Sequence, residues 1–308
     1  MKFGTASLVG IEPMPFAELV QRSSALGIEA LEVNVGPGYA PIGRAAYPGH
    51  LDLPAILRDG PGETLEVVGR YGIVISSLAP MLNLLTPDPA LRATRLGAMR
   101  QAIDAAAALG VETVVTYGGS AFGMHFWGLP GVGDSHPSNK VAENLRQFVE
   151  VYTPLAAYAE DKGVRIAFET APRGGGEGNI AHAPALWDRL FDAVPSAALG
   201  LSFDPSHLVW LHIPNIPDLV RRYGPRIYHF DGKDTEILPG QLAAQGMLGN
   251  GWWRYRLPGC GALDWRAILA ALRDTGYDGA VDIENEDPLA LGLEGAAWSA
   301  RHLRGLLP

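Results

Sequence analysis

The sequence predicts an α/β fold, a (β/α)8 TIM barrel, and three observations lead to it. A helix-like stretch that ends in glycine and runs into a short β-rich segment recurs along the 308 residues. These segments contain Val, Ile and Leu with little polar alternation, which is typical of strands buried on both faces of a parallel sheet. No Gly-x-Gly-x-x-Gly turn follows the first segment, which disfavours the alternative of an open doubly wound sheet. Because no linker or low-complexity stretch divides the chain, we expect residues 1–308 to form one domain.

Eight strands are expected in chain order, six of them directly after a helix that ends in glycine. Glycine is favoured after a helix because this position requires a positive φ angle. The expected strand segments are 2–6, 26–33, 71–78, 109–116, 162–169, 198–203, 223–230 and 275–284. Between them, residues 90–109 and 142–161 show the periodicity of helices, and Pro154 is expected to kink or restart the second helix. Eight alternating strands and helices favour the barrel.

Composition and charge exclude several classes of protein. The formal net charge is −9, which repels phosphate backbones and disfavours nucleic acid as a partner. No apolar run approaches the length of about 18 residues that a membrane span needs, so we expect no membrane association. The single cysteine, Cys260, excludes an intrachain disulfide, and the N-terminal segment lacks the apolar run of a signal peptide. We therefore expect a cytoplasmic protein.

Three unusually long loops follow expected strands. They span residues 39–62, 117–139 and 235–261. In a barrel such loops gather at the C-terminal end of the strands, where active sites lie. Two of these loops carry aromatic residues, namely Phe122, Phe126, Trp127, Trp252, Trp253 and Tyr255. Flat aromatic side chains stack on sugar rings or on an aglycone, although they also suit a hydrophobic lid or a subunit contact.

The last four expected strands end in an acidic residue or a histidine. The residues at these positions are Glu169, Asp204, His229 and Glu284. The ends of neighbouring barrel strands converge, and three carboxylates in one place repel one another unless a cation lies among them. Three carboxylate oxygens and one imidazole nitrogen suit a divalent ion, with Mn²⁺ preferred and Mg²⁺, Co²⁺ or Zn²⁺ as alternatives.

Each of these four residues also has a purely structural interpretation. Asp204 precedes Pro205 and can cap the helix that follows. His229 can be a hydrogen-bonded core histidine, and Glu284 a solvated strand end. Glu169 is followed by a glycine-rich loop, which offers no helix to cap. All of these interpretations would have to hold together on consecutive strands, and this favours the metal site.

Five segments of the second half carry a family resemblance. They read GVRIAFET, LSFDPSHL, IYHFDGKDTEI, RLPGCGALDW and GYDGAVDIENED. Together they resemble the sugar isomerase/epimerase superfamily with the xylose-isomerase-like TIM barrel, which includes ketose 3-epimerases, inosose dehydratases and the endonuclease IV group. The resemblance is strongest over residues 160–288. The first half of the chain matches mainly in the spacing of its expected strands.

The resemblance implies catalytic and metal-binding roles. Glu169, Asp204, His229 and Glu284 look like the metal ligands of the superfamily. Glu169 and Glu284 also look like the opposed acid and base of the ketose epimerases. His207 looks like the residue that contacts a substrate oxygen or carries a proton, although it can equally support the site or cap a helix.

The resemblance also implies substrate contacts. Lys233 and Arg256 look like contacts to substrate oxygens or to an anion. The alternative for both is salt bridging within the loop, with Asp231 or Asp234 as the acidic partner. Trp253 and His125, from the two aromatic loops, complete the expected substrate-binding residues.

The sequence departs from two branches of the superfamily. The positions that carry histidines of the trinuclear zinc site in endonuclease IV read LAPML, TYGGS and DGKD here, without histidine. Together with the net charge, this disfavours DNA repair. Asp231 and Asp234 leave open the second metal site that xylose-type isomerases use.

The sequence therefore predicts a divalent-metal-dependent isomerase or epimerase. It would act on a keto-sugar or polyol ketone by proton transfer through a metal-stabilised enediolate. The alternative is a metal-dependent lyase on an oxidised 3-keto glycoside or an inosose, such as a C-glycoside deglycosidase subunit or a dehydratase. A non-catalytic sugar-binding barrel is disfavoured, because a binder has no evident need for the carboxylate cluster. We expect a carbohydrate substrate and a homo-oligomer, or a hetero-oligomer for a deglycosidase subunit.

Overall fold

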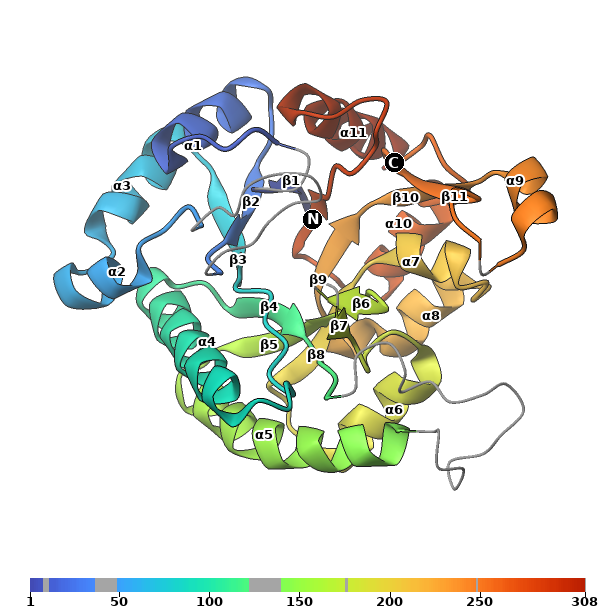
Figure 1. Cartoon of the computed structure of the whole chain (residues 1–308). Coiled ribbons are helices and arrows are strands. Elements are labelled where there is room, and N and C mark those ends of the chain that lie inside the picture. Colours follow the sequence, from blue (N-terminus) through green and yellow to red (C-terminus); the bar gives the residue numbers. More distant parts are fainter. Residues whose placement is uncertain (8–10, 37–48, 122–139, 175–176, 248, 308) are drawn as a thin grey trace.

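The computed structural model describes residues 1–7, 11–36, 49–121, 140–174, 177–247 and 249–307. Eight parallel strands close into a barrel in the order β1-β12-β9-β8-β5-β4-β3-β2, which confirms the predicted (β/α)8 TIM barrel. Seen along the barrel, the helices surround the strands (Figure 1). No helix in the described part of the chain is both long and apolar enough to cross a membrane.

Every barrel strand lies in or next to a segment expected from the sequence. The strands are β1 (Lys2–Ala6), β2 (Ala30–Asn34), β3 (Val74–Ala79), β4 (Thr113–Tyr117), β5 (Arg165–Glu169), β8 (Leu199–Phe203), β9 (Ile227–Gly232) and β12 (Ala280–Ile283). The glycines that end the preceding helices or turns have positive φ angles before five of these strands. Glycines that end helices, together with the apolar runs that follow them, were thus sufficient to locate the strands.

The helices follow the strands in the expected alternation. They are α1 (Phe16–Ala25), α2 (Leu53–Asp59), α3 (Gly62–Tyr71), α4 (Pro89–Leu109), α5 (Val141–Asp161), α6 (Pro184–Ala193), α7 (Pro205–Trp210), α8 (Ile216–Tyr223), α9 (Pro239–Gln245), α10 (Trp265–Asp274) and α11 (Leu293–Leu306), with a 3₁₀ turn at Gly224–Arg226. The expected restart at Pro154 is wrong, because α5 continues through it. The buried side chains Phe148, Tyr152 and Leu155 hold that helix against the barrel.

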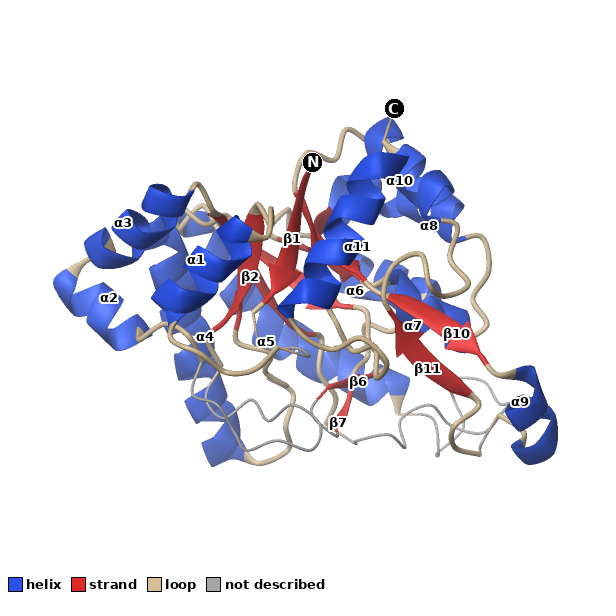
Figure 2. Ribbon diagram, turned by 90° about the horizontal axis from the view of Figure 1, so that it is seen from above, coloured by secondary structure: helices blue, strands red, loops and turns tan. Residues whose placement is uncertain are grey.

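Two short hairpins were not expected from the sequence. They pair β6 (Arg173–Gly174) with β7 (Glu177–Gly178), and β10 (Asp234–Ile237) with β11 (Trp253–Arg256). Both follow barrel strands, so they lie towards the C-terminal end of the barrel, away from the start of β1 (Figure 2). The second hairpin carries Trp253 and Arg256 to the edge of the candidate site.

Asp234 fixes the loop that follows β11. Its carboxylate accepts hydrogen bonds from the backbone N–H groups of Gly259, Gly261 and Leu263. It also accepts one from Trp265 Nε1 at 2.9 Å. Asp234 is therefore a structural residue of the loop, and among the described residues its contacts include no salt bridge to Lys233.

The interior of the barrel contains charged residues as well as apolar ones. Glu32, His229, Asp231 and Asp282 come from three of the strands and lie near one another. Asp282 requires a glycine on the neighbouring strand, because a Cβ atom at Gly4 would lie 1.9 Å from Asp282 Oδ1. The glycine at position 4 therefore leaves the space that the Asp282 carboxylate occupies inside the barrel.

Candidate metal centre

The candidate site lies at the C-terminal ends of four neighbouring strands. Glu169 is the last residue of β5, and Asp204 follows β8 directly. Asp231 lies near the end of β9, and Glu284 follows β12 directly. These strands are consecutive in the barrel, so four carboxyl groups approach one another. Three of the four are residues that the sequence analysis singled out as ligands.

Glu169, Asp204 and His207 form one compact group. One ligand atom of each lies within 4.8 Å of the others. His207 Nε2 lies 3.0 Å from Asp204 Oδ2 and 3.5 Å from Glu169 Oε1. Glu169 Oε1 is buried and lacks a hydrogen-bond partner among the described residues, and Asp204 Oδ2 is buried as well. A buried oxygen without a partner is costly, and a cation bound between the carboxylates would remove this cost.

Lys233 brings a positive charge into the site. Its side chain is 2% exposed, and Nζ lies 2.9 Å from Asp204 Oδ2 and 3.1 Å from Glu286 Oε2. Nζ also contacts Glu284, and the ring of Tyr255 lies 4.4 Å from it. Burial lowers the pKa of Lys233, but Asp204, Glu284 and Glu286 outweigh burial and hold that pKa well above its ordinary value. The ammonium group therefore stays charged and offsets part of the negative charge.

The two glutamates have strongly perturbed acidity. Burial raises the pKa of Glu169 well above its usual value, and the carboxylates of Asp231 and Asp204 raise it further. Burial also raises the pKa of Glu284, and Glu286 adds to this effect although Lys233 opposes it. Without a bound cation, these two carboxyl groups therefore hold their protons to a higher pH than an ordinary glutamate does.

Asp204 serves the fold and the site with different oxygens. Oδ1 accepts a hydrogen bond of 2.8 Å from Ser206 N, so Asp204 caps α7 as the structural interpretation expected. Oδ2 faces His207 and Lys233. Burial raises the pKa of Asp204, but His207 and Lys233 outweigh burial and hold it below the usual range. Asp204 therefore remains an anion that faces the site.

The structure places His229 in a neighbouring group and not among these carboxylates. His229 Nδ1 lies 2.8 Å from Ser202 Oγ. His229 Nε2 lies 2.9 Å from Asp282 Oδ2 and 3.3 Å from Glu32 Oε2. Both ring nitrogens therefore face other protein groups. His229 thus makes the contacts of a hydrogen-bonded core histidine, the structural interpretation that the sequence analysis left open for it.

The group around His229 is strongly coupled by charge. Burial lowers the pKa of His229, but Glu32 and Asp231 outweigh burial and raise it to about 10. Burial raises the pKa of Glu32 to about 7, and His229 opposes this rise. The imidazole is thus held as a cation that bridges acidic side chains.

Arg256 and Trp253 lie together on β11 but make different contacts. Arg256 Nε donates to Asp287 Oδ2 at 2.9 Å, and its guanidinium also pairs with Glu236. Arg256 is thus engaged in salt bridges within the loops, with acidic partners other than those expected. Lys233 also forms salt bridges with acidic residues other than those expected, but its partners, Asp204 and Glu284, come from the ends of strands.

Trp253 belongs to an aromatic wall beside the site. Its ring stacks on Trp210 at a centroid distance of 4.6 Å and lies 4.9 Å from the ring of Tyr255. The hydroxyl of Tyr255 is 3.1 Å from His207 Nδ1. The wall, defined as Trp210, Trp253 and Tyr255, thus reaches from the outer loops to the carboxylates. Its rings offer the flat apolar surface that the sequence analysis expected.

Some expected residues fall outside the described part of the chain. His125, Phe122, Phe126 and Trp127 lie there, as do residues 39–48 of the loop of residues 39–62. Conversely, three residues of the site were missed by sequence reasoning. Glu32 was hidden within an apolar strand, Tyr255 was noted only as one aromatic among several, and Asp231 was considered only as a partner for Lys233 or a second metal site.

The family of the chain follows from a match over most of its length. The xylose isomerase-like TIM barrel family matches residues 20–306. The chain belongs to this family. A similar curated protein is the uncharacterised protein YfiH of Bacillus subtilis, which is 27% identical over an alignment of 306 positions; the match covers 89% of this chain and 89% of that protein.

Two solved structures have folds similar to this xylose isomerase-like barrel. The 3-keto-D-glucoside 4-epimerase YcjR of E. coli has a TM-score of 0.68 and 16% identity, and the match covers 99% of each chain. The IolI protein with a bound zinc atom has a TM-score of 0.68 and 21% identity, covering 99% of this chain and 96% of that one. At these identities the similarity shows the fold.

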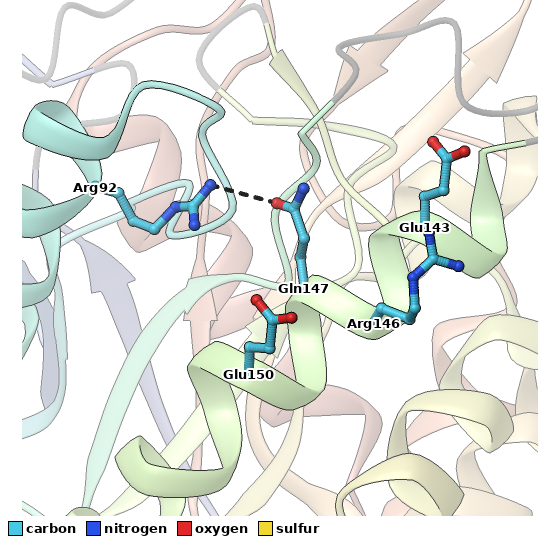
Figure 3. A pocket seen from close by; sticks show the side chains of 5 residues that line it. All are labelled: Arg92, Glu143, Arg146, Gln147 and Glu150. Carbon is cyan, nitrogen blue, oxygen red and sulfur yellow. Dashed lines mark hydrogen bonds between the residues drawn. The ribbon is translucent and has the colours of Figure 1, made fainter.

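A separate cavity lies on the outer side of the barrel, between α4 and α5 (Figure 3). It has a volume of about 280 Å³ and is lined by Arg92, Glu143, Arg146, Gln147 and Glu150. The guanidinium of Arg92 faces Gln147 at 3.5 Å. Two arginines and two glutamates balance in charge, so this cavity does not share the acidic character of the strand-end site.

Proposed function

We propose that this protein is a divalent-metal-dependent isomerase or epimerase that acts on a keto-sugar or polyol ketone. The observation that carries the proposal is the convergence of Glu169, Asp204 and Glu284 in one largely buried place, where Glu169 Oε1 has no hydrogen-bond partner among the described residues. Such an arrangement is unfavourable without a bound cation and is useful with one.

The residues present fit a divalent ion. Glu169 Oε1 is buried without a hydrogen-bond partner among the described residues, and Asp204 Oδ2 is buried beside Lys233 and His207. Hard carboxylate oxygens are the donors that Mn²⁺ and Mg²⁺ prefer. Glu169, Asp204 and Glu284 would hold the ion. Co²⁺ and Zn²⁺ are compatible with the same donors. When bound, the ion would polarise the substrate carbonyl, acidify the adjacent C–H group and stabilise the negative charge that develops on oxygen.

Glu169 and Glu284 would move the proton. They come from β5 and β12, which are separated in the barrel by β8 and β9, so they reach the substrate from different directions. One carboxylate removes the proton beside the carbonyl, and the other returns a proton to the opposite face in an epimerase or to the neighbouring carbon in an isomerase.

Lys233, His207 and the aromatic wall would orient the substrate. Lys233 Nζ and His207 Nε2 face the carboxylates and can donate to substrate oxygens. The wall would cover the C–H face of a sugar ring. The name of YcjR, a 3-keto-D-glucoside 4-epimerase, supports oxidised glucosides as one substrate class to examine.

A lyase is the second candidate, and the position of His207 favours it. His207 lies between Asp204 Oδ2 and the hydroxyl of Tyr255. A histidine held between an acid and a phenol can deliver a proton to a leaving oxygen after the first proton has been removed. The same site would then cleave an oxidised glycoside or dehydrate an inosose.

The test is removal and return of the metal. We expect EDTA to abolish turnover on a panel of ketohexoses, inososes and 3-keto-glucosides, and to lower thermal stability, because the carboxylates lose their ion. Added Mn²⁺ should restore both activity and melting temperature. Full activity after exhaustive chelation would contradict the proposal. Identification of the product as an epimer, an isomer or a cleaved aglycone distinguishes the two candidates.

A further inference from the structure

Asp231 lies between the two groups of ionisable side chains in the barrel. It belongs with Glu32 and His229 to a group whose ligand atoms lie within 4.8 Å. Its carboxylate also raises the pKa values of Glu169 and Glu284. Its side chain is 2% exposed. Asp231 therefore faces the proposed metal site although it was not expected to be a ligand.

Asp231 and Glu169 are both buried near the C-terminal ends of their strands. Two carboxylates brought together in this way repel each other unless a cation lies between them. Glu169 Oε1 is buried and has no hydrogen-bond partner among the described residues, which is an independent sign that a ligand binds here.

Position along β9 separates Asp231 from His229. Both residues lie in the same strand, two positions apart, so their side chains project from the same face. Asp231 is nearer the C-terminal end by about 6–7 Å. His229 lies deeper, where Ser202, Asp282 and Glu32 face both of its ring nitrogens. Of the two residues, Asp231 is the one that lies next to the end of its strand.

We propose that Asp231, and not His229, is the fourth protein donor of the metal site. This inference rests on the proposed function and deepens it by naming the ligand that sets metal preference. Glu169, Asp204, Asp231 and Glu284 together supply four carboxylates from four consecutive strands of the barrel. Replacing the expected imidazole by a carboxylate shifts the preference towards Mn²⁺ and Mg²⁺ and away from Zn²⁺.

His229 is then a positioning residue. Ser202 Oγ lies 2.9 Å from Asp231 Oδ2 and 2.8 Å from His229 Nδ1, so it links the two side chains. On its other side His229 contacts Asp282 at 2.9 Å, and Ser76 donates to the same Asp282 oxygen at 2.6 Å. This chain of contacts fixes the orientation of the Asp231 carboxylate, as partners behind a metal ligand commonly do.

The experiment measures metal affinity directly, without turnover. Mn²⁺ and Zn²⁺ are titrated separately by calorimetry into the chelated full chain of the wild type and of Asp231→Asn, Asp231→His, His229→Gln and Glu169→Gln. Glu236→Gln is the matched control, because Glu236 pairs with Arg254 and Arg256 on the hairpin. We expect Asp231→Asn to weaken Mn²⁺ binding by about 10–100-fold, and His229→Gln to weaken it less. The control should stay within about threefold of the wild type.

The histidine variant tests the metal preference. Asp231→His should raise the ratio of Zn²⁺ affinity to Mn²⁺ affinity by about tenfold or more, because imidazole favours zinc. This variant also decides the matter if Asp231→Asn does not fold. An unchanged ratio in Asp231→His would overturn the proposal.

The remaining outcomes separate this inference from the proposed function. If Asp231→Asn keeps the wild-type Mn²⁺ affinity while Glu169→Gln loses it, Asp231 is no donor and the metal site itself stands. A loss in His229→Gln that equals or exceeds that of Asp231→Asn would return the donor role to His229. If the wild type binds neither Mn²⁺ nor Zn²⁺, the proposed function fails and this inference fails with it.

Discussion

Glu169→Gln and Glu284→Gln should each lower kcat by about 10²–10⁴-fold, the usual scale for removing a general acid or base. The amide keeps the size of the side chain and one oxygen that can bind a metal, but it cannot accept a proton. Because burial and neighbouring charges raise the pKa of both carboxyl groups, removing a charge should not destabilise the metal-free fold. The measurement is steady-state kinetics together with Mn²⁺ titration and thermal melting.

Glu286→Gln is the matched control for this pair. Glu286 comes from the same segment as Glu284 and contacts Lys233 at 3.1 Å, but we assign it no proton transfer. We expect its kcat to fall by less than about tenfold. A similar loss in all three variants would mean that the site responds to total charge, and the assignment of two specific proton-transfer residues would be wrong.

Lys233→Met should destabilise the metal-free protein by about 3–5 kcal/mol near neutral pH, because it removes the buried cation that pairs with carboxylates. Methionine preserves the volume of the side chain but leaves Asp204 and Glu284 without their positive partner. Urea unfolding in the presence of EDTA measures the loss. Added Mn²⁺ should recover much of it, since a divalent ion can replace the missing charge. No recovery would argue against a cation site at these carboxylates.

The loss should grow as the pH rises. Glu169 and Glu284 have raised pKa values in the folded protein, so the folded state binds more protons than the unfolded state above the ordinary carboxyl pKa. Stability is therefore lost as the pH rises towards the folded pKa values, and more so without Lys233. We expect a small difference from the wild type at about pH 4 and a large one at about pH 8.

Lys162→Met provides the comparison for Lys233→Met. Lys162 pairs with Asp104 at 3.0 Å on the surface, where its side chain is 37% exposed. An exposed pair contributes little to the free energy of unfolding, so this variant should unfold almost as the wild type does. Equal losses in the two lysine variants would show that burial of Lys233 among the carboxylates has no special consequence.

The barrel could be predicted because its signals are local. Each strand is an apolar run, and most follow a glycine whose φ angle is positive, as at Gly110 before β4 and Gly163 before β5. The hairpin of β10 and β11 escaped prediction because its strands are polar and are separated by a long insertion. Pairing between such segments depends on tertiary contacts, for example those of Asp234.

The candidate site could be predicted only in part. Residues that follow a strand directly, such as Glu169 and Asp204, are recognisable because a barrel brings strand ends together. The difference between His229 and Asp231 was not recognisable, because alternation in a strand places both on one face. The position of Lys233 between Asp204 and Glu284 depends on three-dimensional contacts between residues far apart in the chain.

Turnover in D₂O tests the central claim of proton transfer most directly. Substrate and product are analysed by mass spectrometry for deuterium at the carbon next to the carbonyl. If Glu169 or Glu284 removes a proton and a carboxyl group returns one from solvent exchange, deuterium appears in the product or in recovered substrate. Turnover without any deuterium incorporation would indicate a hydride shift and would contradict the roles assigned to both glutamates.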